Sequence, residues 1–374
     1  MSTTVAYSPT SGTYKQVNLA TDFDLTLRVI EYDDAFVSPN KPIQSTVDFE
    51  VKRDLVSKQA FSKFMANMLK PSSNFVEGDQ DIVELKDQSC RAIDPFLREL
   101  HFNKDHHVKD VDLDMVWLVL HTADFFGFSL EPLRDWFDKC FQSNVFWATS
   151  LNYARQTLYP TYIFNQAAAF TEATETLVYE GEGHLTESTP FFKASLHLPN
   201  LVIQQLNAAK GRVRNILHDG LFDACRSLLD QSCPCKERVF FGYFKKMCDL
   251  EVLPFETTFK GTSISDMIWR AGHFDWTPPP DSCDSCRRDY HRLIKLATTK
   301  AERYFDGMCL DCMDASKSKT KNGDRHSDYW MHNRLQSWDK GCRVRHGEPS
   351  WYFSFMGRKD DQVKMLREFR RVSN

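Results

Sequence analysis

Hydrophobic residues in the first third of the chain change from alternating to helical spacing. Two stretches place an apolar residue at every second position, first at Phe23, Leu25, Leu27 and Val29 and then at Val47, Phe49 and Val51. This period of two predicts two strands that each bury one face, joined as a hairpin by a long loop. A shorter strand is predicted over residues 81–87.

Four helices are predicted in the same region, because apolar residues recur there at intervals of three and four. They cover residues 57–71, 89–101, 111–127 and 130–142. The apolar face of the first helix consists of Phe61, Phe64, Met65 and Met68. Strands followed by paired helices predict an α+β domain over residues 21–147. The polar, Ser/Thr-rich residues 1–20 predict a disordered tail.

The remaining chain separates into a helical part and a cysteine-rich part. Helical spacing continues through residues 148–275, where aromatic side chains at that spacing are typical of a core. Residues 276–374 contain closely spaced cysteines, a helical stretch over 287–305 and an aromatic alternation over 351–355 that predicts a buried strand. We expect this last part to form a small zinc-stabilised module that packs with the helical domain.

The composition is that of a globular protein whose 374 residues exceed what one hydrophobic core organises. No run approaches the roughly 18 apolar residues of a membrane span, and the first residues lack the basic and apolar regions of a signal peptide. We therefore expect a soluble intracellular protein, cytoplasmic or nuclear, with no membrane partner. In that reducing setting, the eleven cysteines are expected to bind metal or to be buried rather than to form disulfides.

The formal net charge of −4 is divided unevenly along the chain. Residues 281–374 contain 20 Lys and Arg against 14 Asp and Glu, which leaves 27 against 37 for residues 1–280. A basic C-terminal part can meet nucleic acid or an acidic partner. Acidic residues are interleaved throughout it, however, so a solvated surface is the stronger interpretation and nucleic acid is not the expected partner.

The sequence contains none of the catalytic signatures that we searched for. It has no P-loop, nucleophile elbow, His-Glu-x-x-His or kinase motif, and the Gly-Glu-Gly at 181–183 lacks the third glycine of a phosphate-binding loop. Three histidines and two aspartates within residues 101–110 are explained better by a solvated turn than by a metal cluster. We therefore expect that the protein is not an enzyme.

Two Cys-x2-Cys pairs stand in the cysteine-rich part. Cys283 and Cys286 form the first pair, and Cys309 and Cys312 form the second after a spacer of 22 residues. Each pair supplies two thiolates that can bind one ion at about 2.3 Å, so the spacing predicts a structural four-thiolate zinc site. Gly307 is expected to ease the turn that presents the second pair. The alternative is two unrelated pairs of buried thiols.

Four further side chains suggest a second metal site. Cys233 and Cys235 flank a proline, Cys342 and His346 follow about a hundred residues later, and both spacings suit zinc. Burial or surface exposure of free thiols explains the same residues, and the sequence leaves the two interpretations open. The cysteines predicted to lie in the core are Cys90, Cys140, Cys225 and Cys248.

Several motifs in residues 20–147 resemble the BTB/POZ domain in their order along the chain. The stretch "FEVKRDLVSKQAFSKFM" matches the family pattern at Phe49, Val51, Leu55, Phe61 and Phe64. It departs from that pattern because "KRD" replaces the usual histidine and the family's serine is displaced. The strand and helix of "DIVELKDQSCRAIDPFLRELHF" are similar to the family's next elements. The family's alanine-aspartate motif and the leucine-led helix that follows it are similar to the stretch with Ala123, Asp124, Phe125, Leu130 and Leu133.

The later stretches "DGMCLDCMD" and "CRVRHGEPSWYFSFMGR" resemble the C-terminal region of a group of fungal BTB proteins. The resemblance implies protein binding, because BTB domains self-associate and join partners such as cullin-type ubiquitin ligases or transcriptional corepressors. No residue of this chain is assigned to cullin binding. We therefore expect an adaptor, such as a ubiquitin-ligase substrate adaptor. The alternative is a nuclear, nucleic-acid-associated transcriptional regulator.

Overall fold

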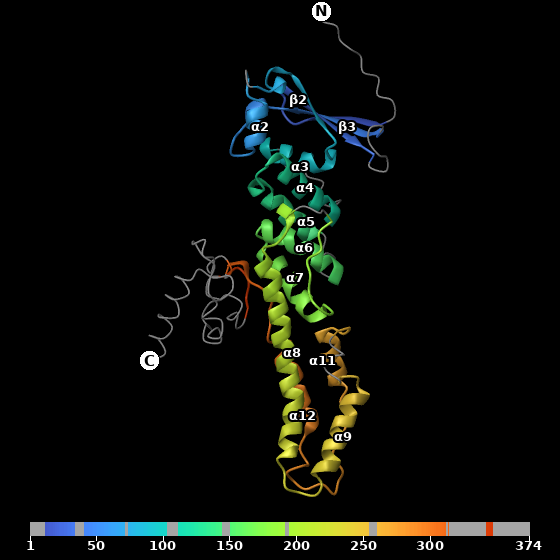
Figure 1. The fold of residues 1–374 in the computed structure, drawn as a ribbon. Helices are drawn as coiled ribbons and strands as arrows, with labels where there is room; N and C mark the ends of the chain where they lie inside the picture. The colour runs from blue at the N-terminus through green and yellow to red at the C-terminus, as the bar shows by residue number, and fades with distance from the viewer. Residues whose placement is uncertain are drawn as a thin grey trace, which may run out of the picture. The chain divides into compact units, whose positions relative to one another are not determined.

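The chain forms two compact units, which Figure 1 draws as a ribbon. The computed structural model describes residues 12–33, 41–71, 74–102, 111–143, 150–190, 194–253, 260–311, 313 and 342–346. Unit 1 comprises Met1–Trp147 and Thr189–His197, and unit 2 comprises Ala148–Ser188 and Leu198–Asn374. The helical and cysteine-rich parts of the sequence therefore fall into one unit.

Unit 1 contains a mixed four-stranded sheet with the strand order β1-β3-β2-β4. The strands are β1 Thr13–Asn18, β2 Leu25–Tyr32, β3 Ile43–Val51 and β4 Ile82–Lys86. Strands β2 and β3 form the predicted antiparallel hairpin, with Leu27 opposite Phe49 and Val29 opposite Val47. The outer strands β1 and β4 run parallel to their neighbours. Phe23 precedes β2 and is exposed, so the prediction that it lies on the buried face is wrong.

The disordered tail expected over residues 1–20 is wrong for the part that the structure describes. Residues 13–18 form β1, which pairs with β3 at the edge of the sheet. The strand has no alternating apolar pattern because all its side chains are exposed or half-buried. Main-chain pairing holds it instead, together with the Tyr14 hydroxyl, which donates to Asp48 at 2.9 Å, and the Gln16 amide, which donates to Glu50 at 2.5 Å.

The helices of unit 1 lie on one side of the sheet (Figure 1). They are α1 Arg53–Val56, α2 Lys63–Met68, η1 Val76–Asp79, α3 Cys90–Leu100, α4 Leu113–Phe126, η3 Glu131–Leu133, α5 Arg134–Ser143 and η5 Ala194–Leu196. Large rings fill the space between them, because Phe96 of α3, Trp117 of α4 and Trp136 of α5 are almost completely buried. Aromatic side chains of this kind bury roughly 150–250 Å² each, so these three contribute substantially to the core.

The helix predicted over residues 57–71 is shorter in the structure, since α2 begins only after Ser62. The Ser62 hydroxyl caps α2 by accepting the Met65 N–H at 3.0 Å, and it donates to the Phe126 carbonyl at 2.6 Å. With this start, Phe61 and Met65 are buried but Phe64 is 45% exposed. The prediction that Phe64 lies on the buried face is therefore wrong.

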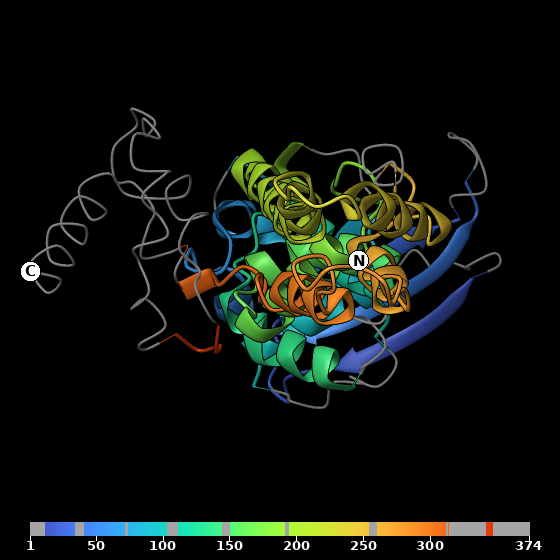
Figure 2. The same ribbon diagram turned by 90° about the horizontal axis from the view of Figure 1, so that it is seen from below.

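Unit 2 is a bundle of helices around the long helix α8. The helices are α6 Leu151–Ile163, α7 Ala167–Glu180, α8 Asn200–Leu229, α9 Lys236–Asp249, α11 Ile264–Gly272 and α12 Tyr290–Glu302. Figure 2 shows α8, α9 and α12 end on. The pair α8 and α12 packs closely at Gly220, where a Cβ atom would lie 2.4 Å from the Cβ of Ala297. No helix in the described part of the chain is both long and apolar enough to cross a membrane.

A lysine is buried between α7 and α8. Lys210 is only 2% exposed, and its ammonium group donates to the carbonyls of Gly181 and Gly183, at 2.9 Å for the second. Burial, with a smaller effect of Arg214 and Arg155, lowers the pKa of Lys210 from 10.5 to about 8. The side chain therefore keeps its charge at neutral pH but loses it at a lower pH than an exposed lysine.

Substituting Lys210→Met is expected to change how stability depends on pH. Between pH 8 and 10.5 the unfolded chain binds more protons at Lys210 than the folded chain does, so this residue raises the free energy of unfolding as pH increases. From pH 7 to pH 10, the parent should gain about 1–3 kcal/mol relative to the variant. Chemical denaturation of both proteins at both pH values measures the difference. A constant difference would show that Lys210 titrates normally.

Candidate metal centre

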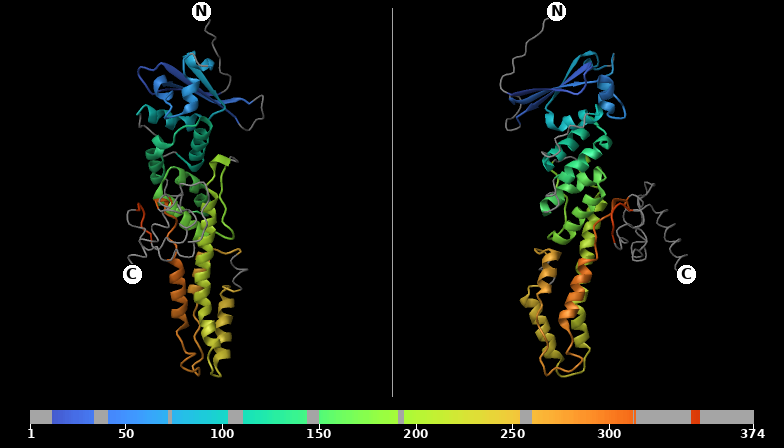
Figure 3. Two further views of the ribbon diagram at one scale, coloured as in Figure 1. Left: turned by 60° about the vertical axis from the view of Figure 1, so that its left-hand side comes forward. Right: turned by 180° about the vertical axis from the view of Figure 1, so that it is seen from behind.

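Four cysteines meet at one end of the helical bundle of unit 2. Cys233 and Cys235 lie in the turn between α8 and α9, and Cys283 and Cys286 lie in the loop before α12. Both segments lie at the same end of α8, α9 and α12, as the two views of Figure 3 show. The four Sγ atoms all lie within 4.8 Å of one another, so this four-cysteine cluster can hold a metal ion.

The distances in the four-cysteine cluster fit a tetrahedral thiolate site. The Sγ atom of Cys233 lies 3.3 Å from that of Cys286 and 3.4 Å from that of Cys235, which lies 3.5 Å from Cys283. A disulfide would require about 2.05 Å. Four bonds of about 2.3 Å to a central ion place neighbouring sulfurs about 3.8 Å apart, so a small expansion accommodates the ion.

The surroundings of Cys235 and Cys286 shift the pKa values of these two thiols in opposite directions. The backbone N–H of Cys283 donates to the Sγ of Cys235 at 3.4 Å, and this hydrogen bond lowers the pKa of Cys235 to about 7. Burial raises the pKa of Cys286, whose side chain is fully buried. A divalent cation supplies the positive charge that a buried thiolate needs, and it deprotonates coordinating thiols. The arrangement therefore suits a bound cation better than four free thiols.

An aromatic cluster supports the loop that carries the Cys-x2-Cys pair of this site. The Tyr290 hydroxyl donates to the carbonyl of Cys286 at 3.2 Å. The Tyr290 ring lies 5.3 Å from that of Tyr243 and 5.5 Å from that of Trp276. Trp276 packs directly against α9 at Gly242, where a Cβ atom would lie 2.6 Å from the indole. These rings fix the direction in which the loop presents its thiols.

A second group of ligands lies beyond the other end of α12. Cys309, Cys342 and His346 place their ligand atoms within 4.8 Å of one another. We call these three residues the Cys-Cys-His group. The helix α12 has 13 residues and spans about 20 Å, so the chain carries this group away from the four-cysteine cluster.

The structure pairs the predicted ligands differently from the hypothesis based on the sequence. The Cys-x2-Cys pair before α12 meets the Cys-Pro-Cys segment after α8, whereas Cys309 meets Cys342 and His346. Cys312 lies outside the described residues. The sequence hypothesis assumed that the helix between the two Cys-x2-Cys pairs would return the chain to the metal. The single helix α12 instead holds Cys309 apart from the first Cys-x2-Cys pair, at its opposite end. The turn between α8 and α9 supplies the two thiols that complete the group with Cys283 and Cys286.

Three of the four cysteines predicted to be in the core are buried, namely Cys90, Cys140 and Cys225. Cys248 is exposed, so that prediction is wrong. The buried face of α9 consists of Val239, Tyr243 and Met247. These residues recur at intervals of four, and the residue that follows Met247 points about 100° away from their face.

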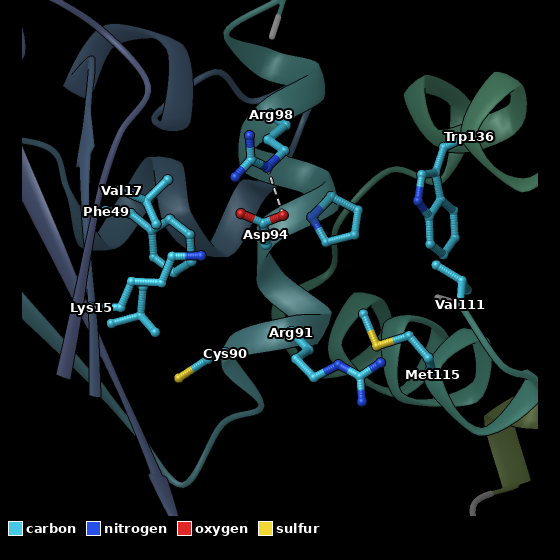
Figure 4. Close-up of a pocket in the computed structure, with 12 residues that line it drawn as sticks. Lys15, Val17, Phe49, Cys90, Arg91, Asp94, Arg98, Val111, Met115 and Trp136 are labelled. Atoms are coloured by element: carbon cyan, nitrogen blue, oxygen red, sulfur yellow. Dashed lines mark hydrogen bonds and ion pairs between the residues drawn. The ribbon is translucent and has the colours of Figure 1, made fainter. Parts of the chain in front are cut away.

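Unit 1 contains a cavity of about 400 Å³ between the sheet and helices α3, α4 and α5 (Figure 4). Its walls include the apolar rings of Phe49 and Trp136 and the ammonium group of Lys15. The Arg98 guanidinium at its edge donates to Asp94 at 2.7 Å. The volume lies in the range of small-ligand pockets, and the lining suits an apolar group next to an anionic one.

A second depression in unit 1 lies where the start of α2 meets the end of α4, and five of the eleven residues that line it are phenylalanines. Phe64 and Phe125 are 45% and 54% exposed there. The ring of the buried Phe126 contacts both of them, with its centroid 6.0 Å from that of Phe64 and 4.9 Å from that of Phe125. We call this depression the aromatic hollow. Successive side chains of a helix point in different directions, so Phe125 and Phe126 cannot both face the core of unit 1. The pair therefore predicts one exposed ring, which our expectations from the sequence did not include.

The seven residues of these two groups were all candidate ligands in the sequence, but the sequence did not predict which of them meet. Comparison of the chain with family models, curated proteins and solved structures finds no match in any of the three. The function proposed below therefore depends on the residues and geometry of this chain.

Proposed function

We propose that this chain is a non-catalytic adaptor that binds other proteins through unit 1 and is stabilised by a metal ion in unit 2. The observation that carries the proposal is the aromatic hollow, where Phe64 and Phe125 expose large rings side by side with buried ones. Exposed apolar surface of this kind is unfavourable in water, and aromatic side chains contribute much of the binding energy at protein interfaces.

The resemblance of unit 1 to the BTB/POZ domain supports the same function. The hairpin β2–β3, the helices α1 and α2, the strand β4 and the helix α3 follow one another in the order that the resemblance implies. Of its motif residues, Phe49, Val51 and Phe61 are buried. A BTB-like unit implies self-association or a protein partner, for example a cullin-type ligase.

In unit 2, we take the ion of the four-cysteine cluster to be zinc. Four thiolates at tetrahedral spacing are the ligand set that structural zinc sites use. A site with four protein ligands leaves no position for a water molecule or a substrate, so its role is to stabilise the fold. This is the reason that we assign the chain a binding function and no catalytic one.

Placing negative charge in the aromatic hollow is expected to abolish the function of unit 1. The double variant Phe64→Asp and Phe125→Asp should weaken self-association or partner binding at least about tenfold, because aromatic interface residues commonly contribute 2 kcal/mol or more. Analytical ultracentrifugation of the purified chain measures self-association. Affinity purification from the native cell with quantitative mass spectrometry measures partner capture.

The control is Phe241→Asp, which changes a ring that is 68% exposed on α9 of unit 2. Self-association and partner capture should stay at the parent level in this variant. Equal loss in both variants, or full binding by the double variant, would contradict the role of the aromatic hollow. A parent chain that is monomeric and captures no protein would contradict the adaptor function.

A further inference from the structure

The chain after α12 is fixed against α7 by side-chain hydrogen bonds. The Thr171 hydroxyl donates to the Met308 carbonyl at 3.0 Å, and the Met308 N–H donates to Thr174 at 2.8 Å. Three residues earlier, the Phe305 N–H donates to the Tyr179 hydroxyl at 3.2 Å. These bonds hold the backbone just before Cys309, so its thiol has a defined position in unit 2.

The segment 342–346 is attached to the same place by one arginine. The backbone N–H and the Nε atom of Arg343 donate to Asp311 at 2.7 and 2.9 Å. Its two terminal nitrogens donate to the main-chain and side-chain oxygens of Asn165, at 2.9 and 2.7 Å. All three guanidinium nitrogens of Arg343 are hydrogen-bonded, so the side chain is held in one geometry. These bonds fix the segment 342–346 against Asp311 and Asn165.

This attachment brings three soft ligands together. Cys309 is fully buried, His346 is 8% exposed and Cys342 is half-buried, with the three ligand atoms within 4.8 Å of one another. Neither Cys309 nor Cys342 forms a disulfide. The surface next to His346 carries more acidic than basic groups, because Glu172, Glu175 and Asp306 line it together with Arg345. Thiolate and imidazole ligands in an acidic setting favour a borderline-soft divalent cation.

We propose that the Cys-Cys-His group is a second metal site, separate from the four-cysteine cluster, and that its ion fastens the segment 342–346 to unit 2. Zinc is the ion that this ligand set fits best, because structural zinc sites commonly combine thiolates with one histidine.

The test uses the full chain, purified under reducing conditions and equilibrated with zinc. Metal analysis should find about two zinc ions per chain, one for each group of ligands. Cys342→Ser and His346→Ala should each reduce the content to about one, and adding Cys286→Ser to either should remove the second. The single variant Cys286→Ser should retain one ion, so failure of the four-cysteine site is distinguishable from failure of this one.

Replacing zinc with cobalt gives a readout of ligand identity. Cobalt bound to four thiolates and cobalt bound to thiolates and one histidine absorb differently, so the spectrum of the parent should be the sum of two sites. His346→Ala should remove only the histidine-containing component.

Cys248→Ser serves as the matched control, since Cys248 is an exposed cysteine outside both groups. It should retain two ions and the parent spectrum. A parent with one ion per chain whose content is unaffected by Cys342→Ser and His346→Ala would overturn the proposal. Circular dichroism shows whether a variant is folded. Should the Cys342 variant misfold, the cobalt spectrum of the parent still decides, because the absence of a histidine-containing component would contradict the second site.

Discussion

Replacing Cys286 with serine is expected to release one zinc ion per chain and to unfold the end of unit 2 that contains the four-cysteine cluster. Cys286 is fully buried, and its Sγ atom lies 3.3 Å from that of Cys233. A neutral serine hydroxyl cannot replace a thiolate as a zinc ligand. Zinc binding contributes roughly 10–16 kcal/mol in zinc-finger peptides, which is comparable to the roughly 5–15 kcal/mol of stability of a whole protein.

Metal analysis and limited proteolysis measure this effect. Cleavage should appear in the turn between α8 and α9 and in the loop before α12, while unit 1 stays resistant. Cys248→Ser is the control, because this thiol is exposed and lies outside the cluster. If the Cys286 variant retained the zinc content and the protease resistance of the parent, the four-cysteine cluster would not be a metal site.

Gly307→Ala is expected to be the other strongly destabilising change. Gly307 has φ +83°, and a Cβ atom there would lie 2.1 Å from the carbonyl oxygen of Thr171. The backbone cannot move aside, because Met308 is hydrogen-bonded to both Thr171 and Thr174. The positive φ and the collision together should lower the free energy of unfolding by about 3 kcal/mol or more. Because Cys309 follows directly, zinc binding at the Cys-Cys-His group should weaken as well.

The matched control is Gly211→Ala within α8, where a Cβ atom would meet nothing within 4 Å. Alanine has the higher helix propensity, so this variant should be more stable than the parent by up to about 1 kcal/mol. Chemical denaturation followed by circular dichroism compares the two variants. Similar stability for both would mean that the turn at Gly307 accepts a side chain.

The elements predicted best are those whose burial leaves a period in the sequence. Strand β2 and helix α3 each bury one face, so their apolar residues recur at two and at three and four, respectively. Strand β1 leaves no such period, since main-chain hydrogen bonds hold it at the edge of the sheet. The start of α2 was also missed, because Ser62 both caps the helix and bonds to distant Phe126.

The candidate site was predicted at the level of residue type but not of partners. Cysteine and histidine at short spacings indicate metal chemistry whatever the fold, and this pattern singled out the candidate ligands. Which pairs meet depends on how α8, α9 and α12 are arranged, and no local pattern encodes that arrangement. Exposure of Phe64 and Phe125 likewise depends on how α2 approaches α4.

The position of the two ligand groups along the chain sets an order for biosynthesis. The four-cysteine cluster joins residues 48 apart at Cys235 and Cys283, and it is complete once Cys286 has left the ribosome. The Cys-Cys-His group must wait until His346 has emerged, 60 residues later. Since translation proceeds at roughly 5–20 residues per second, the first ion can be captured several seconds before the second. A nascent chain arrested between these points would be loaded with one metal and still lack the fastening of its C-terminal segment.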